Sequence, residues 1–153
     1  NLAEDLKGKY INRKVKQEIK TNKYYLLRGS DYRNVDNENK VVQYCMSRGY
    51  EIIDPNSLSV MSQINLFSEA SVIISPTGAA LTNLVFCNSG ARAGILYSDS
   101  KLLDLNLWPK LVAATSRIKV SIIKCKSKNT DYMHSDYSIS QKDLSDFIDL
   151  VEA

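Results

Sequence analysis

The sequence is poor in the residues that build metal sites and disulfide scaffolds. It has one histidine, His134, and three widely spaced cysteines, Cys45, Cys87 and Cys125, among 153 residues. Each cysteine lies in an apolar stretch, which is typical of small buried side chains in a reducing compartment. No ligand-type residue stands at metal-binding spacing from His134, and no Asp-x-Asp pair occurs. We therefore expect no bound metal and no metal cofactor.

Several other signals are also missing. No apolar run approaches the eighteen or so residues that cross a bilayer, and no signal-peptide pattern opens the chain. The absence of Asn-x-Ser/Thr sites also favours a cytoplasmic location. The six glycines form no Gly-x-Gly-x-x-Gly, P-loop or Gly-x-Ser-x-Gly pattern, which argues against dehydrogenases, P-loop NTPases and serine hydrolases. The first residue is Asn1 rather than Met, which suggests a processed chain or a piece of a longer one.

The composition is that of a globular protein, with 44% hydrophobic and 24% charged residues. The positive charge is concentrated in residues 1–23, where Ile11, Val15 and Ile19 recur at helical spacing between lysines. We expect a basic amphipathic lead-in helix over residues 1–22 and a folded domain over residues 23–153. The helix either packs on the protein or contacts an anionic membrane surface as a peripheral element. Nucleic acid is not an expected partner, because no aromatic residues alternate with the lysines.

The remaining chain alternates short apolar runs with helical stripes. Strands are expected at residues 24–27, 50–53, 71–75, 91–97 and 118–125, and a polar loop at residues 126–137. Apolar helix faces are expected at Val41, Val42, Cys45 and Met46; at Val60, Ile64 and Phe67; at Leu81–Phe86; at Trp108, Leu111, Val112 and Thr115; and, after an N-cap at Ser140, at Leu144, Phe147, Ile148 and Val151. Gly49 is placed to end the first of these helices. The pattern predicts an α/β fold, a three-layer Rossmann-like parallel sheet of about five strands in the order 2-1-3-4-5.

Ligands of such sheets bind beyond the carboxyl ends of the strands, at the point where the strand order reverses. The loops expected there are residues 28–33 and 75–80. The second loop begins a helix at Gly78 with small residues, an arrangement that leaves backbone N–H groups facing the crevice. Arg28 and Arg33 in the first loop add planar guanidinium groups, which pair bidentately with phosphate. Together the two loops fit a diphosphate.

Residues 70–86, with the sequence ASVIISPTGAALTNLVF, resemble the signature segment of the family 61 glycosyltransferases. Arg28 and Arg33-Asn34 ahead of an Asn- and Glu-rich helix, and the segment from Ser135 to Ile139, resemble two further family segments. The likeness extends over about residues 22–152. Many family members have His where this chain has Thr77, and Glu where this chain has Ile95. The second difference leaves a carboxylate contact of the family type unfilled.

The resemblance implies the carboxyl-terminal, donor-binding half of a GT-B glycosyltransferase with two Rossmann-like domains. Its activity would be metal-independent, inverting transfer of a hexose or pentose from a nucleotide sugar to a glycan acceptor. The setting would be biosynthesis of cell-surface or capsular polysaccharide at the inner face of the membrane. The partner would be a missing N-terminal acceptor domain of the same protein. The implied donor-binding residues are Arg28, Arg33, Pro76, Thr77, Gly78, Ala79, Ala80 and Asn83, with Asn83 bracing the loop.

The catalytic base is not identified by the sequence. Asp31 and Asp54 qualify only by position, and each is typical of a loop or turn, so the base is expected on the acceptor domain. An alternative function also stands: a nucleotide-sugar binding or assembly module without catalytic activity. Release of nucleotide diphosphate in the presence of donor and acceptor separates the two.

Overall fold

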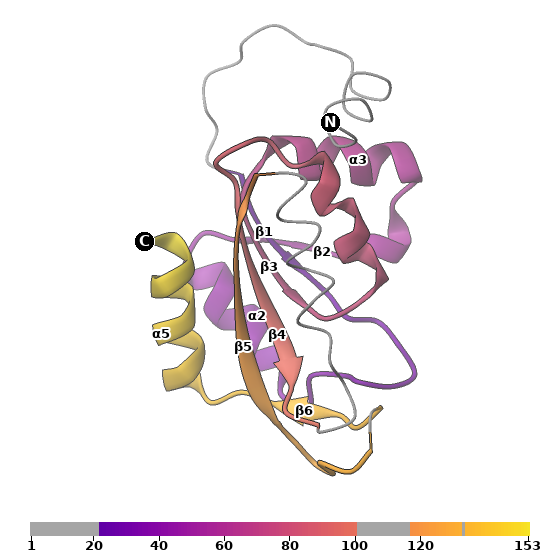
Figure 1. Ribbon diagram of the computed structural model, residues 1–153, viewed down its shortest axis with the longest axis vertical. Helices are drawn as coiled ribbons and strands as arrows, with labels where there is room; N and C mark the ends of the chain where they lie inside the picture. The colour runs from indigo at the N-terminus through magenta and orange to yellow at the C-terminus, as the bar shows by residue number, and fades with distance from the viewer. Residues whose placement is uncertain (1–21, 101–116, 133) are drawn as a thin grey trace, which may run out of the picture.

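The computed structural model describes residues 22–100, 117–132 and 134–153 (Figure 1). The lead-in helix expected over residues 1–22 falls almost entirely outside these residues, as does the helical face expected at Trp108, Leu111, Val112 and Thr115. The described strands are β1 (Asn22–Leu26), β2 (Glu51–Ile53), β3 (Ala70–Pro76), β4 (Arg92–Ser98), β5 (Lys119–Ser127) and β6 (Tyr137–Ser138). The described helices are α2 (Glu38–Ser47), η1 (Pro55–Ser57), α3 (Val60–Glu69), η2 (Ala79–Phe86) and α5 (Gln141–Glu152), where η denotes a 3₁₀-helix.

The strands form one curled sheet in the order β2-β1-β3-β4-β5-β6. The first five are parallel in the order expected from the sequence, so that prediction is confirmed. The sixth was not expected, because residues 126–137 read as a polar loop. Lys126 and Ser127 instead extend β5 and pair antiparallel with Ser138 and Tyr137. The Tyr137 side chain is fully buried, and strand pairing satisfies the backbone groups beside it.

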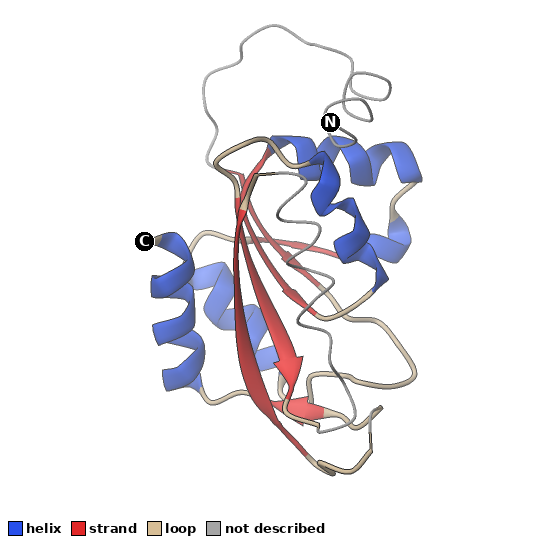
Figure 2. Cartoon of the chain, viewed as in Figure 1, coloured by secondary structure: helices blue, strands red, loops and turns tan. Residues whose placement is uncertain are grey.

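Helices cover both faces of the sheet (Figure 2). On one face α2 and α5 contribute Val41, Cys45, Leu144, Phe147, Ile148 and Val151 to a core with Tyr25, Ile74 and Leu96. On the other face α3 and η2 contribute Ile64, Phe67, Leu81 and Leu84 to a second core with Leu26, Ile73 and Ile95. Both faces of β3 are therefore covered, which explains why its sequence is nearly all apolar. The arrangement is a mixed α/β fold compatible with the Rossmann-like class.

The packing of α5 on the sheet depends on Gly94. A Cβ atom at this position would come within 2.6 Å of Ile74 Cδ1 and 2.8 Å of Val151 Cγ2. The absence of a side chain lets α5 approach the β4 backbone directly. The helix begins as the sequence predicts, with Ser140 Oγ accepting from the Asp143 N–H at 3.1 Å.

Some helix details differ from the sequence interpretation. Met46 is 59% exposed, because it follows the buried Cys45 by one position and so lies about 100° around the helix. Val60 is 71% exposed, since it is the first residue of α3 after the N-cap Ser59. The helix expected to begin at Gly78 is a 3₁₀-helix from Ala79 to Phe86, with Gly78 as its N-cap. Gly49 follows α2 with a φ of +83°, as expected for a helix stop.

The three cysteines are buried and free of disulfide bonds, as the sequence indicated. Burial raises the pKa of Cys45 and of Cys125 to about 12, so both thiols stay protonated at neutral pH.

Within the described residues, no helix is both long enough and apolar enough to cross a membrane.

An ionic network closes the end of the sheet at which β1 begins. Glu152, near the end of α5, accepts from Lys23 Nζ at 2.9 Å, Arg48 Nη2 at 2.9 Å and Tyr50 Oη at 2.8 Å. Burial alone would raise the pKa of the Glu152 carboxyl, but these hydrogen bonds and the nearby positive charge hold it below its usual value. The network ties α5 to β1 and to the end of α2.

Candidate functional site

A cavity of about 160 Å³ lies at the carboxyl ends of β1, β2 and β3. The strand order places β1 between β2 and β3, so the loops that follow these three strands meet there. The described residues that line it are Leu27, Arg28, Gly29, Ser30, Pro55, Asn56, Ser75, Pro76, Gly78, Ala79 and Ala80. Arg28 is the one charged residue among them. The two loops singled out in the sequence are therefore brought together.

Arg28 is fixed at this cavity by its backbone and its guanidinium. Its N–H donates to Glu38 Oε1 at 3.1 Å, and Nε and Nη2 donate to the carbonyls of Arg33 and Tyr32 at 3.4 Å. Nη1 lies 2.8 Å from where a Cβ on Gly78 would be. Burial lowers the pKa of Arg28, and the neighbouring charge of Arg33 lowers it further. The site therefore holds a partly buried positive charge against the start of η2.

Gly78 is required here by space rather than by backbone conformation. Its φ of −176° is an extended value that any residue adopts, whereas an added side chain would meet Arg28. The N–H groups of Ala79 and Ala80 open η2, where a helix has no internal acceptors for them. Both residues line the cavity. Backbone donors and one guanidinium thus converge on a small space, an arrangement suited to an anion.

Two predicted residues lie beside the cavity rather than on it. The Thr77 hydroxyl donates to the carbonyl of Leu96 at 2.9 Å, and so does the Thr77 N–H. This residue therefore anchors the loop to β4. Asn83 donates to Gln63 Oε1 at 2.8 Å, and Gln63 Nε2 donates to the Pro55 carbonyl at 2.9 Å. Through Gln63, Asn83 braces the rim formed by the loop after β2.

Arg33 also lies outside the cavity lining. It has a φ of +56°, a left-handed conformation that is uncommon for a residue with a side chain. Its Cζ lies 5.2 Å from the centre of the Tyr32 ring, and its buried Nε has no hydrogen-bond partner. Arg33 therefore adds positive charge next to Arg28 but does not line the cavity.

The loop that carries both arginines is held by residues about a hundred positions later in the chain. The Arg33 N–H donates to the His134 carbonyl at 3.1 Å, and the Asn34 N–H donates to Asp136 Oδ1 at 2.8 Å. Tyr137 then exchanges backbone hydrogen bonds with Asn34 and Asp36. In Figure 1 this loop runs from the end of β1 toward β6. The resemblance pointed to this later segment, but its support of the arginine loop was not foreseen.

Pro55 and Asn56 line the cavity and were missed as site residues. Both follow β2, so the predicted strand order contained the signal that their loop would adjoin β1. Asn56 Nδ2 donates to the Gly29 carbonyl at 3.4 Å and links the two loops. Asp54 accepts from the Asn56 N–H as the cap of η1, and Asp31 is exposed. Neither aspartate lines the cavity.

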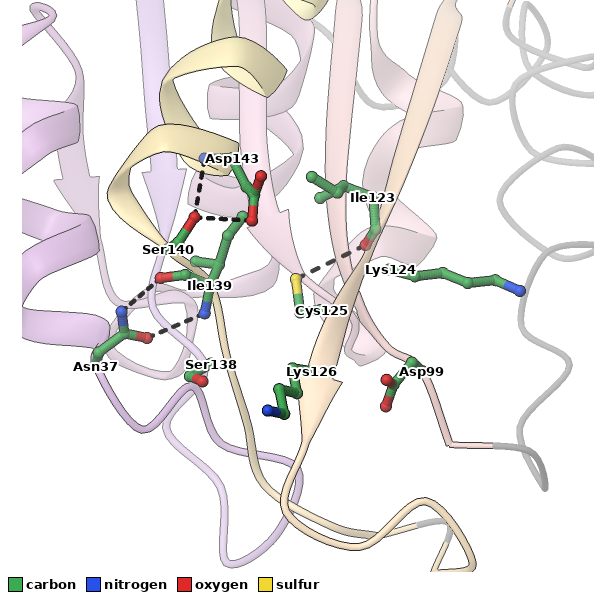
Figure 3. Close-up of a pocket in the computed structure, with 10 residues that line it drawn as sticks. All are labelled: Asn37, Asp99, Ile123, Lys124, Cys125, Lys126, Ser138, Ile139, Ser140 and Asp143. Atoms are coloured by element: carbon green, nitrogen blue, oxygen red, sulfur yellow. Dashed lines mark hydrogen bonds between the residues drawn. The ribbon is translucent and has the colours of Figure 1, made fainter.

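A second, larger hollow of about 890 Å³ lies between β5 and the start of α5 (Figure 3). Several of its polar groups are already engaged within the protein. Asn37 exchanges two hydrogen bonds with the backbone of Ile139, and Asp99 accepts from Ser127. Figure 3 shows Lys124 extending away from α5. Unlike the cavity beside Arg28, this hollow is lined by neither of the two loops that follow β1 and β3.

Among the described residues, no group of three or more His, Cys, Asp or Glu side chains is placed to hold a metal ion. Comparison with curated proteins returns no match. The glycosyltransferase 61 family model matches residues 2–94, which is more than half of the chain. The matched region contains every predicted site residue and ends within β4. The chain therefore belongs to the glycosyltransferase 61 family.

Proposed function

We propose that the cavity beside Arg28 binds the diphosphate of a nucleotide-sugar donor. The observation that carries this proposal is the guanidinium of Arg28 held against Gly78, beside the first N–H groups of η2. Burial and the charge of Arg33 both disfavour this cation, as the lowered pKa of Arg28 reflects. A bound anion would relieve that cost, because it compensates both positive charges. The site is therefore complementary to a doubly charged group.

The proposed reaction is inverting transfer of the sugar to a glycan acceptor in the biosynthesis of cell-surface polysaccharide. As the bond to the sugar breaks, negative charge grows on the leaving diphosphate. Arg28 and Arg33, with the N–H groups of Ala79 and Ala80, would stabilise that charge from fixed positions. The arginines supply the positive charge in this proposal, so the reaction is metal-independent.

The proposal assigns this chain the donor-binding role in a GT-B enzyme. Neither Asp31 nor Asp54 reaches the cavity, so the base that activates the acceptor hydroxyl would come from a partner acceptor domain. The setting would be the cytoplasmic face of the membrane, with the basic residues 1–23 as a candidate peripheral contact. A binding module without catalytic activity would use the same cavity but would never release nucleotide diphosphate.

The first test measures the binding of UDP, GDP, CMP and dTDP, each with and without magnesium. Binding is monitored by thermal shift and by calorimetry. We expect one nucleoside diphosphate to raise the melting temperature without metal. Arg28→Ala should weaken its binding by about 1 to 3 kcal/mol, or roughly 5- to 150-fold. Lys142→Ala removes one exposed positive charge on α5 and is the matched control.

If the Arg28→Ala variant binds the nucleoside diphosphate as tightly as the wild type, Arg28 does not contribute to the site. The catalytic part of the proposal is tested with the full-length protein, donor and acceptor. Release of nucleotide diphosphate in this mixture supports transfer. Binding without release under any acceptor condition would favour the non-catalytic module.

A further inference from the structure

A cluster of three aromatic side chains lies next to the arginine loop. The rings of Tyr32 and His134 are 4.5 Å apart between centroids and tilted by 60°, and the Tyr132 ring meets His134 edge-on at 5.6 Å. Tyr32 is 43% exposed and Tyr132 is 52% exposed. None of the three belongs to either hydrophobic core. Core packing therefore does not explain why these rings gather here.

The cluster is continuous with the proposed diphosphate site. Arg28 Nη2 donates to the backbone carbonyl of Tyr32, while Nη1 of the same guanidinium lies against Gly78 in the cavity. One guanidinium group therefore separates the cavity from the aromatic cluster. Arg33 Cζ lies 5.2 Å from the Tyr32 ring and adds positive charge at the same place. A ligand that pairs with Arg28 is therefore bound next to the backbone of Tyr32, whose side chain is exposed.

Several energetically unfavourable features lie together at this cluster. Arg33 has left-handed backbone geometry, and two buried nitrogen atoms, Arg33 Nε and His134 Nδ1, have no hydrogen-bond partner. Unpaired buried polar atoms and strained backbone are each unfavourable and gather at binding sites. Exposed tyrosine rings add to the same picture, because they retain apolar surface for a partner. The cluster thus has the features of a surface arranged for a ligand.

We propose that Tyr32 and Tyr132, supported by His134, bind the nucleobase of the donor. This inference rests on the proposed function, since the diphosphate places the rest of the nucleotide beside Arg28. A nucleobase is planar and aromatic, and it stacks on tyrosine rings and on guanidinium planes whatever its identity. Both kinds of surface are present here. A sugar ring, the other candidate occupant, lacks a π face to stack on Arg33.

The test separates the base from the diphosphate. Calorimetry measures binding of inorganic diphosphate, of the preferred nucleoside diphosphate and of the corresponding nucleotide sugar to the full chain. The variants are Tyr32→Ala and Tyr132→Ala, with Tyr32→Phe and Tyr132→Phe retaining the rings. We expect each alanine variant to bind the nucleoside diphosphate roughly 5- to 150-fold more weakly, the range for loss of one stacked base. Binding of inorganic diphosphate should not change, and the phenylalanine variants should resemble the wild type.

Three results would overturn the inference. An equal loss for nucleoside diphosphate and inorganic diphosphate would show that the tyrosines only support the loop. No loss for either ligand would show that the rings do not touch the nucleotide. A loss confined to the nucleotide sugar would assign the rings to the sugar. Failure of the proposed diphosphate site looks different, because the wild-type chain would then not bind inorganic diphosphate or would bind it independently of Arg28.

Discussion

Gly78→Ala should weaken ligand binding while leaving the fold intact. The new Cβ would lie 2.8 Å from Arg28 Nη1, whereas ordinary contacts begin near 3.4 Å. The nearest obstacle is the end of a flexible side chain rather than backbone, so the guanidinium moves and the fold does not. The extended φ of −176° adds no backbone strain for alanine. Relieving this contact displaces the Arg28 guanidinium by about 0.6 Å, the difference between 2.8 and 3.4 Å.

The size of the effect follows from Coulomb's law. Increasing a charge separation from about 4 to about 4.6 Å at an effective dielectric constant near 20 costs about 0.5 kcal/mol, or about 2.5-fold in affinity. Misaligned hydrogen bonds add to this loss. The upper limit is the loss caused by Arg28→Ala, roughly 150-fold. Stability should change by less than about 1 kcal/mol, the scale of an unfavourable N-cap residue.

Calorimetry with inorganic diphosphate and the preferred nucleoside diphosphate measures the affinity, and thermal melting measures the fold. A double-mutant cycle sharpens the test, because Gly78→Ala should cost nothing further once Arg28 is alanine. Unchanged affinity in Gly78→Ala would refute the reasoning. So would an undiminished loss in the Arg28→Ala background, which would place the effect on the η2 backbone instead.

Three further predictions concern the framework. Gly94→Ala should overpack the α5 contact and destabilise the fold by about 1 to 3 kcal/mol, with a lower melting temperature and unchanged diphosphate affinity; an unchanged melting temperature would contradict it. Because the pKa of Glu152 is depressed, its stabilisation is present above its usual pKa of 4.5 and is lost as the pH falls through the folded value. In the Glu152→Gln variant the melting temperature should therefore fall less steeply as the pH is lowered. The control Asp146→Asn, on the exposed side of α5, should show the same pH dependence as the wild type. A Glu152→Gln variant with the wild-type pH dependence would disprove this. Asp136→Ala should speed amide hydrogen exchange in the arginine loop, since it leaves the Asn34 N–H unpaired, whereas Asp136→Asn retains an acceptor and should exchange like the wild type.

The parallel part of the sheet was predictable because the spacing of apolar residues and the general rules for connecting parallel strands led to the same fold. The nearly all-apolar sequence of β3 indicated a strand covered on both faces, and the spacing from Leu144 to Val151 marked the buried face of α5. The sixth strand was not predictable in this way. Its two residues carry no periodic signal. In the fold Tyr137 is buried and its hydroxyl donates to the Leu96 carbonyl of β4, a tertiary contact that sequence spacing does not reveal.

The place where the two candidate loops meet could be predicted from the sequence, whereas the contacts that hold them there could not. Topology alone placed Arg28 and Gly78 at one crevice, because the carboxyl ends of adjacent parallel strands share an edge. The direction of the Thr77 hydroxyl and the fixing of Arg28 by Glu38 depend on side-chain packing, which sequence spacing does not encode. The same holds for the aromatic cluster, whose members Tyr32 and His134 come from loops about a hundred residues apart.

The dependence of the arginine loop on Asp136 and Tyr137 sets an order of events during synthesis. Domains begin to form while the chain is still being made, and contacts between distant segments are the last and slowest to close. Arg28 and Arg33 emerge from the ribosome about a hundred residues ahead of the groups that hold their loop. The nascent chain therefore cannot complete the geometry of the candidate site until the segment before α5 has been translated.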